Sequence, residues 1–157
     1  MDSSYAPKVL GFLCQWCSYS GADLAGAMRL QYPPEIRIIM VPCTGRIDIL
    51  HLLQAFEVGA DAVFVSGCHL GDCHYVAGNY HAWKRVERVK GILQSVGLEP
   101  ERVEMFHVSA SEGPKFAAVA KEMPERAYKL GPNPVRREVR SAWLAQRPAA
   151  GEMARQD

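Results

Sequence analysis

The sequence has no excess of charge of either sign. Its 157 residues include 18 lysines and arginines and 17 aspartates and glutamates, which give a formal net charge of +1. A surface that follows the phosphates of a nucleic acid needs a concentration of positive charge. We therefore expect no nucleic acid among the partners of this protein.

Long apolar runs are also missing. No stretch approaches the roughly 20 consecutive apolar residues that cross a lipid bilayer. The first residues, MDSSYAPKVLGFLC, lack the basic start and the small-residue cleavage site of a signal peptide. We expect a cytoplasmic protein that does not associate with a membrane.

Motifs for nucleotide binding and acid–base catalysis are absent too. Neither a GxGxxG motif after the first apolar run nor a Walker loop is present. The aspartates are scattered, and no two carboxylates form an obvious acid–base pair, so we predict no catalytic residue. A flavin mononucleotide site stays open as an alternative, because polar residues 18–20 follow the first apolar run and a phosphate can bind at a helix start.

Short apolar runs alternate with amphipathic segments along the chain. The runs predict strands over residues 8–13, 35–41, 60–65 and 102–108. Helical spacing of apolar residues predicts helices over 22–32, 47–58, 80–96 and 114–130. The alternation predicts a small doubly wound, flavodoxin-like α/β domain, with a parallel sheet of about four strands and helices on both faces.

A change of composition after residue 130 predicts a domain over residues 1–130 and a C-terminal extension over 131–157. The extension is basic, is interrupted by prolines and carries one amphipathic patch around Val135, Val139, Trp143 and Leu144. Such a tail often docks on a partner, and packing on its own domain is the alternative.

The five cysteines fall into three groups, each at the end of an expected strand. The groups are CQWC with Cys14 and Cys17, VPCTGR with Cys43, and SGCHLGDCHY with Cys68 and Cys73. The carboxyl ends of parallel strands form one edge of a sheet, where such folds build their binding crevice. We expect the five thiols to converge there, and in a reducing compartment clustered thiols bind metal or carry out redox chemistry.

Several kinds of site fit these thiols. Iron–sulfur clusters and structural zinc both use about four thiolates, and five are available. The Cys68–Cys73 spacing is wide for a zinc knuckle, which favours a cluster over a zinc-stabilised scaffold. A dithiol oxidoreductase would use Cys14 and Cys17 and leave the other three without a role. Buried cysteines can also be plain small hydrophobes, although five at successive strand ends fit this poorly.

The remaining site residues have secondary roles in this interpretation. If four cysteines ligate, Cys43 is the predicted spare, because it is alone in its loop. His69 and His74 adjoin cysteines and are expected to hydrogen bond to cluster sulfur or to pack the loop. His51 and His107 are expected to be ordinary structural histidines.

The segments CQWCSYSGADLAGAMRLQYPPEIRIIMVPCTGRID and GADAVFVSGCHLGDCHYVAGNYHAWKR closely resemble the delta subunit of methyl-viologen-reducing hydrogenase. The likeness runs from about residue 11 to 130, with CxWC, Cys-x-Gly-Arg and GCHxGDCHY in the same order. The resemblance implies an electron conduit that carries one 2Fe-2S cluster. It also implies partners: a hydrogenase or formate dehydrogenase subunit on one side, and the flavin subunit of heterodisulfide reductase in an electron-bifurcating complex on the other.

The family's cysteines correspond to Cys14, Cys17, Cys43, Cys68 and Cys73 of this sequence, and four of the five are expected to ligate. The resemblance therefore implies an electron-transfer subunit of an oxidoreductase complex that makes and breaks no substrate bonds itself.

Overall fold

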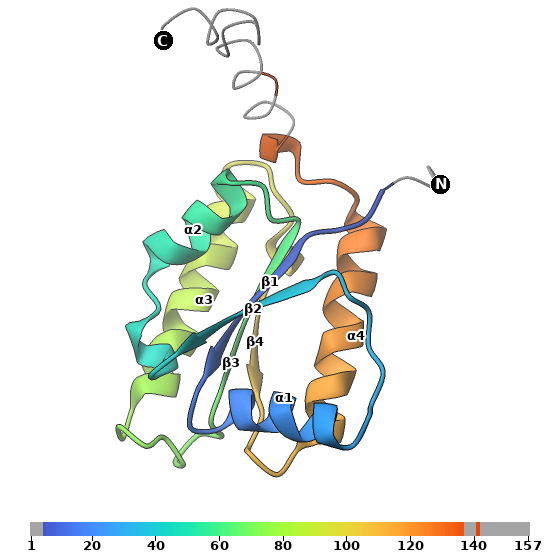
Figure 1. Ribbon diagram of the computed structural model, residues 1–157. Helices are drawn as coiled ribbons and strands as arrows, with labels where there is room; N and C mark the ends of the chain where they lie inside the picture. The colour runs from blue at the N-terminus through green and yellow to red at the C-terminus, as the bar shows by residue number, and fades with distance from the viewer. Residues whose placement is uncertain (1–4, 137–140, 142–157) are drawn as a thin grey trace, which may run out of the picture.

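The computed structural model describes residues 5–136 and residue 141, and its centre is one parallel sheet (Figure 1). Its four strands are β1 (Val9–Cys14), β2 (Ile36–Val41), β3 (Ala62–Gly67) and β4 (Val103–His107), in the order β2-β1-β3-β4. The chain leaves β1 toward one side to form β2 and returns on the other side to form β3. The β1/β3 boundary is therefore the topological switch point, where ligands of such sheets bind.

Four helices cover the two faces of the sheet. The helices α2 (Ile49–Glu57) and α3 (Gly78–Ser95) lie on one face, and α1 (Ser18–Ala27) and α4 (Gly113–Leu130) lie on the other (Figure 1). Each face has its own core, because β3 is buried along its whole length and sends alternate side chains to both. The predicted doubly wound α/β fold is confirmed. None of the described helices is long and apolar enough to cross a bilayer.

The first helix differs from the prediction. It begins at Ser18 rather than residue 22 and ends at Ala27 rather than residue 32. Polar residues open it because the buried Ser18 hydroxyl donates to the Val108 carbonyl at 3.2 Å and accepts from the Ser66 hydroxyl at 2.9 Å. The helix stops early because Arg29 has a left-handed backbone, with φ at +56°, well before the prolines.

The chain after α4 returns to the amino-terminal edge of the sheet. Asn133 is fully buried there, and its side-chain amide donates to the carbonyls of Phe56 and Ala60 at 2.9 and 2.8 Å. Its backbone N–H donates to the buried Asp61 carboxylate at 2.8 Å, which Arg136 also contacts at 3.0 Å. The first six residues of the expected extension thus pack on their own domain.

Of the amphipathic patch expected in the extension, Val135 packs against the α2/α3 core. Residues Val139, Trp143 and Leu144 lie outside the described residues.

Candidate metal centre

All five cysteines lie at or just beyond the carboxyl ends of strands. Cys14 is the last residue of β1, Cys68 directly follows β3, and Cys43 follows β2 after one proline. Cys17 immediately precedes α1, and Cys73 lies in the loop that leads to α3. This edge is the lower one in Figure 1, and both ends of the main described segment lie at the opposite pole. No disulfide joins any of the five thiols.

Three of the thiols form a compact buried triad. The Sγ atoms of Cys14, Cys17 and Cys68 all lie within 4.8 Å of one another, and each residue is at least 95% buried. The Cys68 and Cys17 sulfurs are 3.0 Å apart. The triad lies at the β1/β3 switch point, where it presents soft sulfur donors of the kind that bind zinc or iron–sulfur clusters.

The other two thiols form a pair next to the triad. The Sγ atoms of Cys43 and Cys73 are 3.9 Å apart, and the Cys43 sulfur accepts a hydrogen bond from the Gly45 N–H at 3.4 Å. The triad is adjacent to the turn that carries Cys43, because the Cys14 thiol lies 3.8 Å from the carbonyl oxygen of Pro42. The donor set fits a metal centre that takes the triad and one member of the pair.

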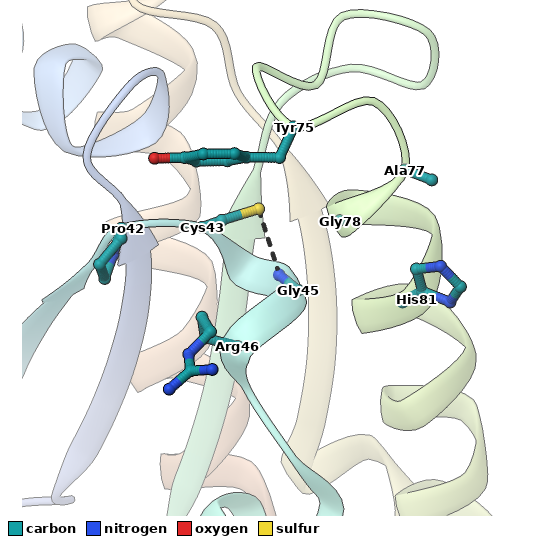
Figure 2. Close-up of a pocket in the computed structure, with 8 residues that line it drawn as sticks. All are labelled: Pro42, Cys43, Gly45, Arg46, Tyr75, Ala77, Gly78 and His81. Atoms are coloured by element: carbon teal, nitrogen blue, oxygen red, sulfur yellow. Dashed lines mark hydrogen bonds between the residues drawn. The ribbon is translucent and has the colours of Figure 1, made fainter.

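Two glycines let the backbone close around the pair. A Cβ atom at Gly78 would fall 2.2 Å from the Cys43 sulfur and 3.3 Å from the Cys73 sulfur. A Cβ atom at Gly45 would fall 2.7 Å from the Cα of Gly78. Figure 2 shows the Cys43 thiol between the Gly45 turn and the start of α3 at Gly78. Only glycine permits this approach of the turn after β2 to the helix that follows the Cys73 loop.

The thiols differ in their affinity for protons. Hydrogen bonding from the Cys17 thiol lowers the pKa of Cys14 to about 6, and the same contact, together with burial, raises the pKa of Cys17. Burial raises the pKa of Cys43 to about 11 and also raises the pKa of Cys68. Cys14 therefore has the most acidic of these four thiols.

Cys73 has a lowered pKa for a different reason. Burial opposes its thiolate, but backbone N–H groups of Asn79, Tyr75 and Gly78 outweigh burial and hold the pKa below its ordinary value. Two of these N–H groups belong to the first turn of α3, where a helix favours negative charge.

Polar side chains hold the Cys68 turn in place. The buried Asn79 amide donates to the carbonyls of Cys68 and His69 at 3.0 and 2.7 Å. The ring of His107 contacts the same Cys68 carbonyl through Nδ1 at 2.8 Å. His107 thus has the structural role expected of it, and it holds the backbone of Cys68, a residue of the candidate site.

The other histidines of the site contact loop groups. His69 Nε2 lies 2.7 Å from the carboxylate of Glu112, which also accepts from the Ser109 N–H. The His74 ring stacks on Trp16, with centroids 4.0 Å apart. His69 and His74 therefore pack the loops, which is one of the two roles predicted for them. His51 completes the capping box of α2, in agreement with a structural role.

The alternative flavin phosphate site at residues 18–20 has little room. Ser18 is fully buried and uses its hydroxyl within the domain, and the Ser20 hydroxyl donates to the Gln15 carbonyl at 3.1 Å. These hydroxyls stabilise the start of α1 instead of facing an open crevice.

Three features of the site carried no clear sequence signal. They are the Trp16–His74 stack, the hydrogen bonds from Asn79 to the Cys68 turn, and the close approach of Gly78 to the Cys43 sulfur. Each joins residues from different loops or elements. The one available hint was the concentration of aromatic, glycine and histidine residues around the cysteines.

A cavity of about 430 Å³ opens beside the Cys43 thiol (Figure 2). The ring of Tyr75 extends over the sulfur on one side of the cavity, and Arg46 and His81 line it farther out. The candidate metal centre is thus bordered by a hollow that is open to another molecule.

Comparison with known proteins places these features in a family. Residues 9–131 match the family described as methyl-viologen-reducing hydrogenase, delta subunit. The iron-sulfur subunit of the vhc F420-non-reducing hydrogenase of Methanococcus voltae is 49% identical over 132 residues, which cover 84% of this chain and 92% of that protein. The iron-sulfur subunit of the F420-non-reducing hydrogenase of Archaeoglobus profundus is 45% identical over 132 residues, which cover 84% and 96%.

A similar segment occurs inside a much longer protein. One subunit of the ferredoxin:CoB-CoM heterodisulfide reductase of Methanosarcina mazei is 42% identical over 129 residues, which cover 82% of this chain but 16% of that protein. The same domain is therefore found both as a separate hydrogenase subunit and as part of a long heterodisulfide reductase chain.

Proposed function

The chain belongs to the family of the methyl-viologen-reducing hydrogenase delta subunit, and from this we propose that it is an electron-transfer subunit that carries one 2Fe-2S cluster. The observation that carries the proposal is the convergence of five thiols from three strand ends on one edge of the sheet. When bound, such a cluster takes up and gives back one electron at a time. The chain itself makes and breaks no substrate bonds.

We propose that the triad of Cys14, Cys17 and Cys68 holds the cluster together with one member of the pair, Cys43 or Cys73. The triad sulfurs are already close enough to share a metal centre, and Cys14 lies next to the pair. Cys73 is favoured as the fourth ligand because backbone N–H groups at the start of α3 stabilise its thiolate, so Cys43 is the proposed spare.

The chain's own residues have three tasks in this function. Burial of the triad excludes water from the sulfur atoms. The N–H groups at the start of α3 stabilise negative charge on Cys73. The Asn79 and His107 contacts fix the Cys68 turn, so that the thiols keep one arrangement when the charge of the site changes.

The names of the relatives support a place between two larger modules. We propose that the protein relays electrons between a hydrogenase or formate dehydrogenase subunit and the flavin subunit of a heterodisulfide reductase-type, electron-bifurcating complex in the cytoplasm. Residues 1–130 would form the iron–sulfur domain. The extension over 131–157, anchored through Asn133 and Arg136, would reach toward a partner.

The test is the metal content of anaerobically purified full-length protein. Two irons and two acid-labile sulfides per chain, with one binuclear EPR signal after dithionite reduction, are expected. Zinc without sulfide would contradict the proposal in favour of a zinc-stabilised scaffold. Absence of both metals would point to a dithiol oxidoreductase.

Serine variants test the ligand set in the same assay. Cys68→Ser should lose the visible spectrum, because the triad then lacks one sulfur. Cys43→Ser and Cys73→Ser form a matched pair, in which Cys73→Ser should lose iron and Cys43→Ser should keep it. Full iron content in both Cys68→Ser and Cys73→Ser would contradict the assignment.

A further inference from the structure

Arg46 has no role in the metal centre, although it follows the Cys43 turn directly. It lines the cavity beside the Cys43 thiol, whose walls are formed by Pro42, Cys43, Gly45, Arg46, Tyr75, Ala77, Gly78 and His81. Figure 2 shows the Arg46 side chain directed away from the sulfur, on the same side of the cavity as Pro42. The cavity therefore has a thiol and an aromatic ring at one end and an exposed guanidinium nearby.

The Arg46 guanidinium in the cavity wall has no carboxylate partner in residues 5–136. Within residues 5–136, neither Arg46 nor His81 forms an ion pair, and no carboxylate is among the lining residues. The nearby Asp48 carboxylate accepts the Ile49 N–H as the cap of α2. The Arg46 guanidinium is therefore the charged group that the cavity offers to an entering side chain.

A half-buried contact fixes the turn that carries Arg46. The guanidinium of Arg85 donates to the carbonyls of Gly45 and Ile47 at 2.7 and 2.8 Å. The turn is also held between Gly78 and the thiol pair, where a Cβ at Gly45 would not fit. The cation is thus presented on a rigid support, which lowers the entropy cost of binding.

Exposed apolar side chains occur in the same loop and first turns of α3 that supply Tyr75, Ala77, Gly78 and His81 to the cavity wall. Val76 is 85% exposed, Leu70 is 61% exposed, and the rings of Tyr75, Tyr80 and Trp83 are also exposed. Val76 has φ at +75°, a conformation that is strained for a β-branched residue. Exposed aromatic residues close in sequence to a pocket wall, as Tyr80 and Trp83 are to His81, are typical of protein–protein interfaces.

We propose that this cavity and its rim are the docking site for the protein that exchanges electrons with the chain, and that an acidic side chain of that protein enters the cavity beside Arg46. The inference rests on the proposed electron-transfer function. Charge complementarity determines the chemistry of the entering group, and the adjacent Cys43 and Gly78 place it next to the thiols.

The occupant is a heterodisulfide reductase chain of the class that the Methanosarcina mazei relative represents. In that relative, a segment similar to this domain is part of the reductase chain, so the two are covalently linked there. The chain enters β1 and leaves α4 at the pole opposite the carboxyl ends of the strands, where the cysteines lie (Figure 1). A linker attached at either end would leave the cysteine pole free to face the rest of the reductase chain.

The test measures the affinity of the iron-loaded full-length protein for a purified heterodisulfide reductase chain of that class from the same organism. Arg46→Glu should weaken binding by about tenfold or more, because it places like charges against each other in the cavity. Lys121→Glu makes the same change of charge on the exposed face of α4 and should alter the affinity less than about twofold. Raising the salt concentration should weaken binding of the original protein more than binding of Arg46→Glu.

Iron and sulfide are measured on the same samples, so that failure of the proposed function can be distinguished from failure of the docking site. An original protein without iron would contradict the proposed function. An iron-loaded Arg46→Glu variant that binds the reductase chain as tightly as the original would overturn the docking site. Arg46-dependent self-association of the protein alone, seen by sedimentation, would overturn it in favour of a second copy as occupant.

Discussion

The ring of Trp16 stacks on the ring of His74, with centroids 4.0 Å apart and planes inclined by 11°. Trp16 lies between Cys14 and Cys17, and His74 directly follows Cys73, so the stack joins the two cysteine loops that are farthest apart in sequence. Together these rings line a cavity of about 260 Å³ that also touches Cys17 and Cys68. The stack therefore closes one side of the candidate metal centre.

Replacing Trp16 by leucine should make the metal centre more accessible to water and oxygen. Loss of the stack frees the two loops and lets water reach the triad, so we expect bleaching of the visible spectrum in air to be several-fold faster than in the original protein. Trp83→Leu removes another half-exposed tryptophan, on α3, and is the control. Equal bleaching rates for the two variants would show that the stack does not protect the site.

Gly78→Ala should disrupt the pair of thiols. The added methyl group would lie 2.2 Å from the Cys43 sulfur, and relief of this clash should cost about 1–3 kcal/mol and reduce the iron content. Gly91→Ala is a matched control in the same helix, because a Cβ there meets nothing within 4 Å. That variant should be more stable than the original by about 0.5–1 kcal/mol. Urea unfolding and iron analysis compare them, and equal iron in both would refute the steric role of Gly78.

The strands and the position of the cysteines could be predicted because both depend on local patterns. Apolar runs such as 60–65 mark buried strands, and right-handed crossovers leave one arrangement in which every strand end faces the same edge. Cys14, Cys43 and Cys68 follow from that geometry. Their chemistry was then limited by the small number of ions that prefer several thiolates.

The finer organisation could not be read from the sequence, because it depends on contacts between distant residues. The early start of α1 at Ser18 needs the carbonyl of Val108, which is 90 residues away. The division of the thiols into a triad and a pair depends on how closely α3 approaches the turn after β2 at Gly78. The burial of Asn133 depends on carbonyls at the end of α2, which no local pattern reveals.

The metal-free protein should show a thiolate near pH 6 that belongs to Cys14. Hydrogen bonding from Cys17 lowers the pKa of Cys14 to about 6, so the ultraviolet absorbance of a thiolate should appear near pH 6 and be lost in Cys14→Ser. Cys17→Ser removes the thiol that lowers this pKa and should move the transition toward the ordinary value of 9.0. A transition near pH 6 that persists in Cys14→Ser would refute the assignment.

The same shift predicts how stability depends on pH. Because the folded pKa of Cys14 is below the unfolded value, the folded chain has lost a proton that the unfolded chain retains between about pH 6 and pH 9. The contribution of Cys14 to the free energy of unfolding is therefore complete above about pH 9 and is lost as the pH falls through 6. Urea unfolding of the metal-free protein should show this slope, and Cys14→Ser should reduce it.

The contacts of Asn133 predict where the folded unit ends. A chain that stops after residue 130 lacks Asn133 and Arg136, so the Ala60 carbonyl loses its donor, the Phe56 carbonyl keeps the Gly59 N–H, and the buried Asp61 carboxylate loses two contacts. Each buried polar group left without a partner costs about 1–3 kcal/mol. The chain ending at 130 should therefore unfold at clearly lower urea concentration than one ending at 136, with the iron content of the folded protein unchanged, because these contacts lie at the pole opposite the cysteines.

Asn133→Ala in the full-length chain isolates the side-chain part of this effect. It should account for about 1–3 kcal/mol of the loss, because its fully buried amide donates to the Ala60 carbonyl and is a second donor to the Phe56 carbonyl. Asn133→Asp is the matched variant of similar shape, and it should be at least as unstable because it places a second carboxylate beside Asp61 and removes the donor. Equal stability of chains ending at 130 and 136 would mean that the domain is complete at residue 130 and that the contacts of Asn133 only tether the extension.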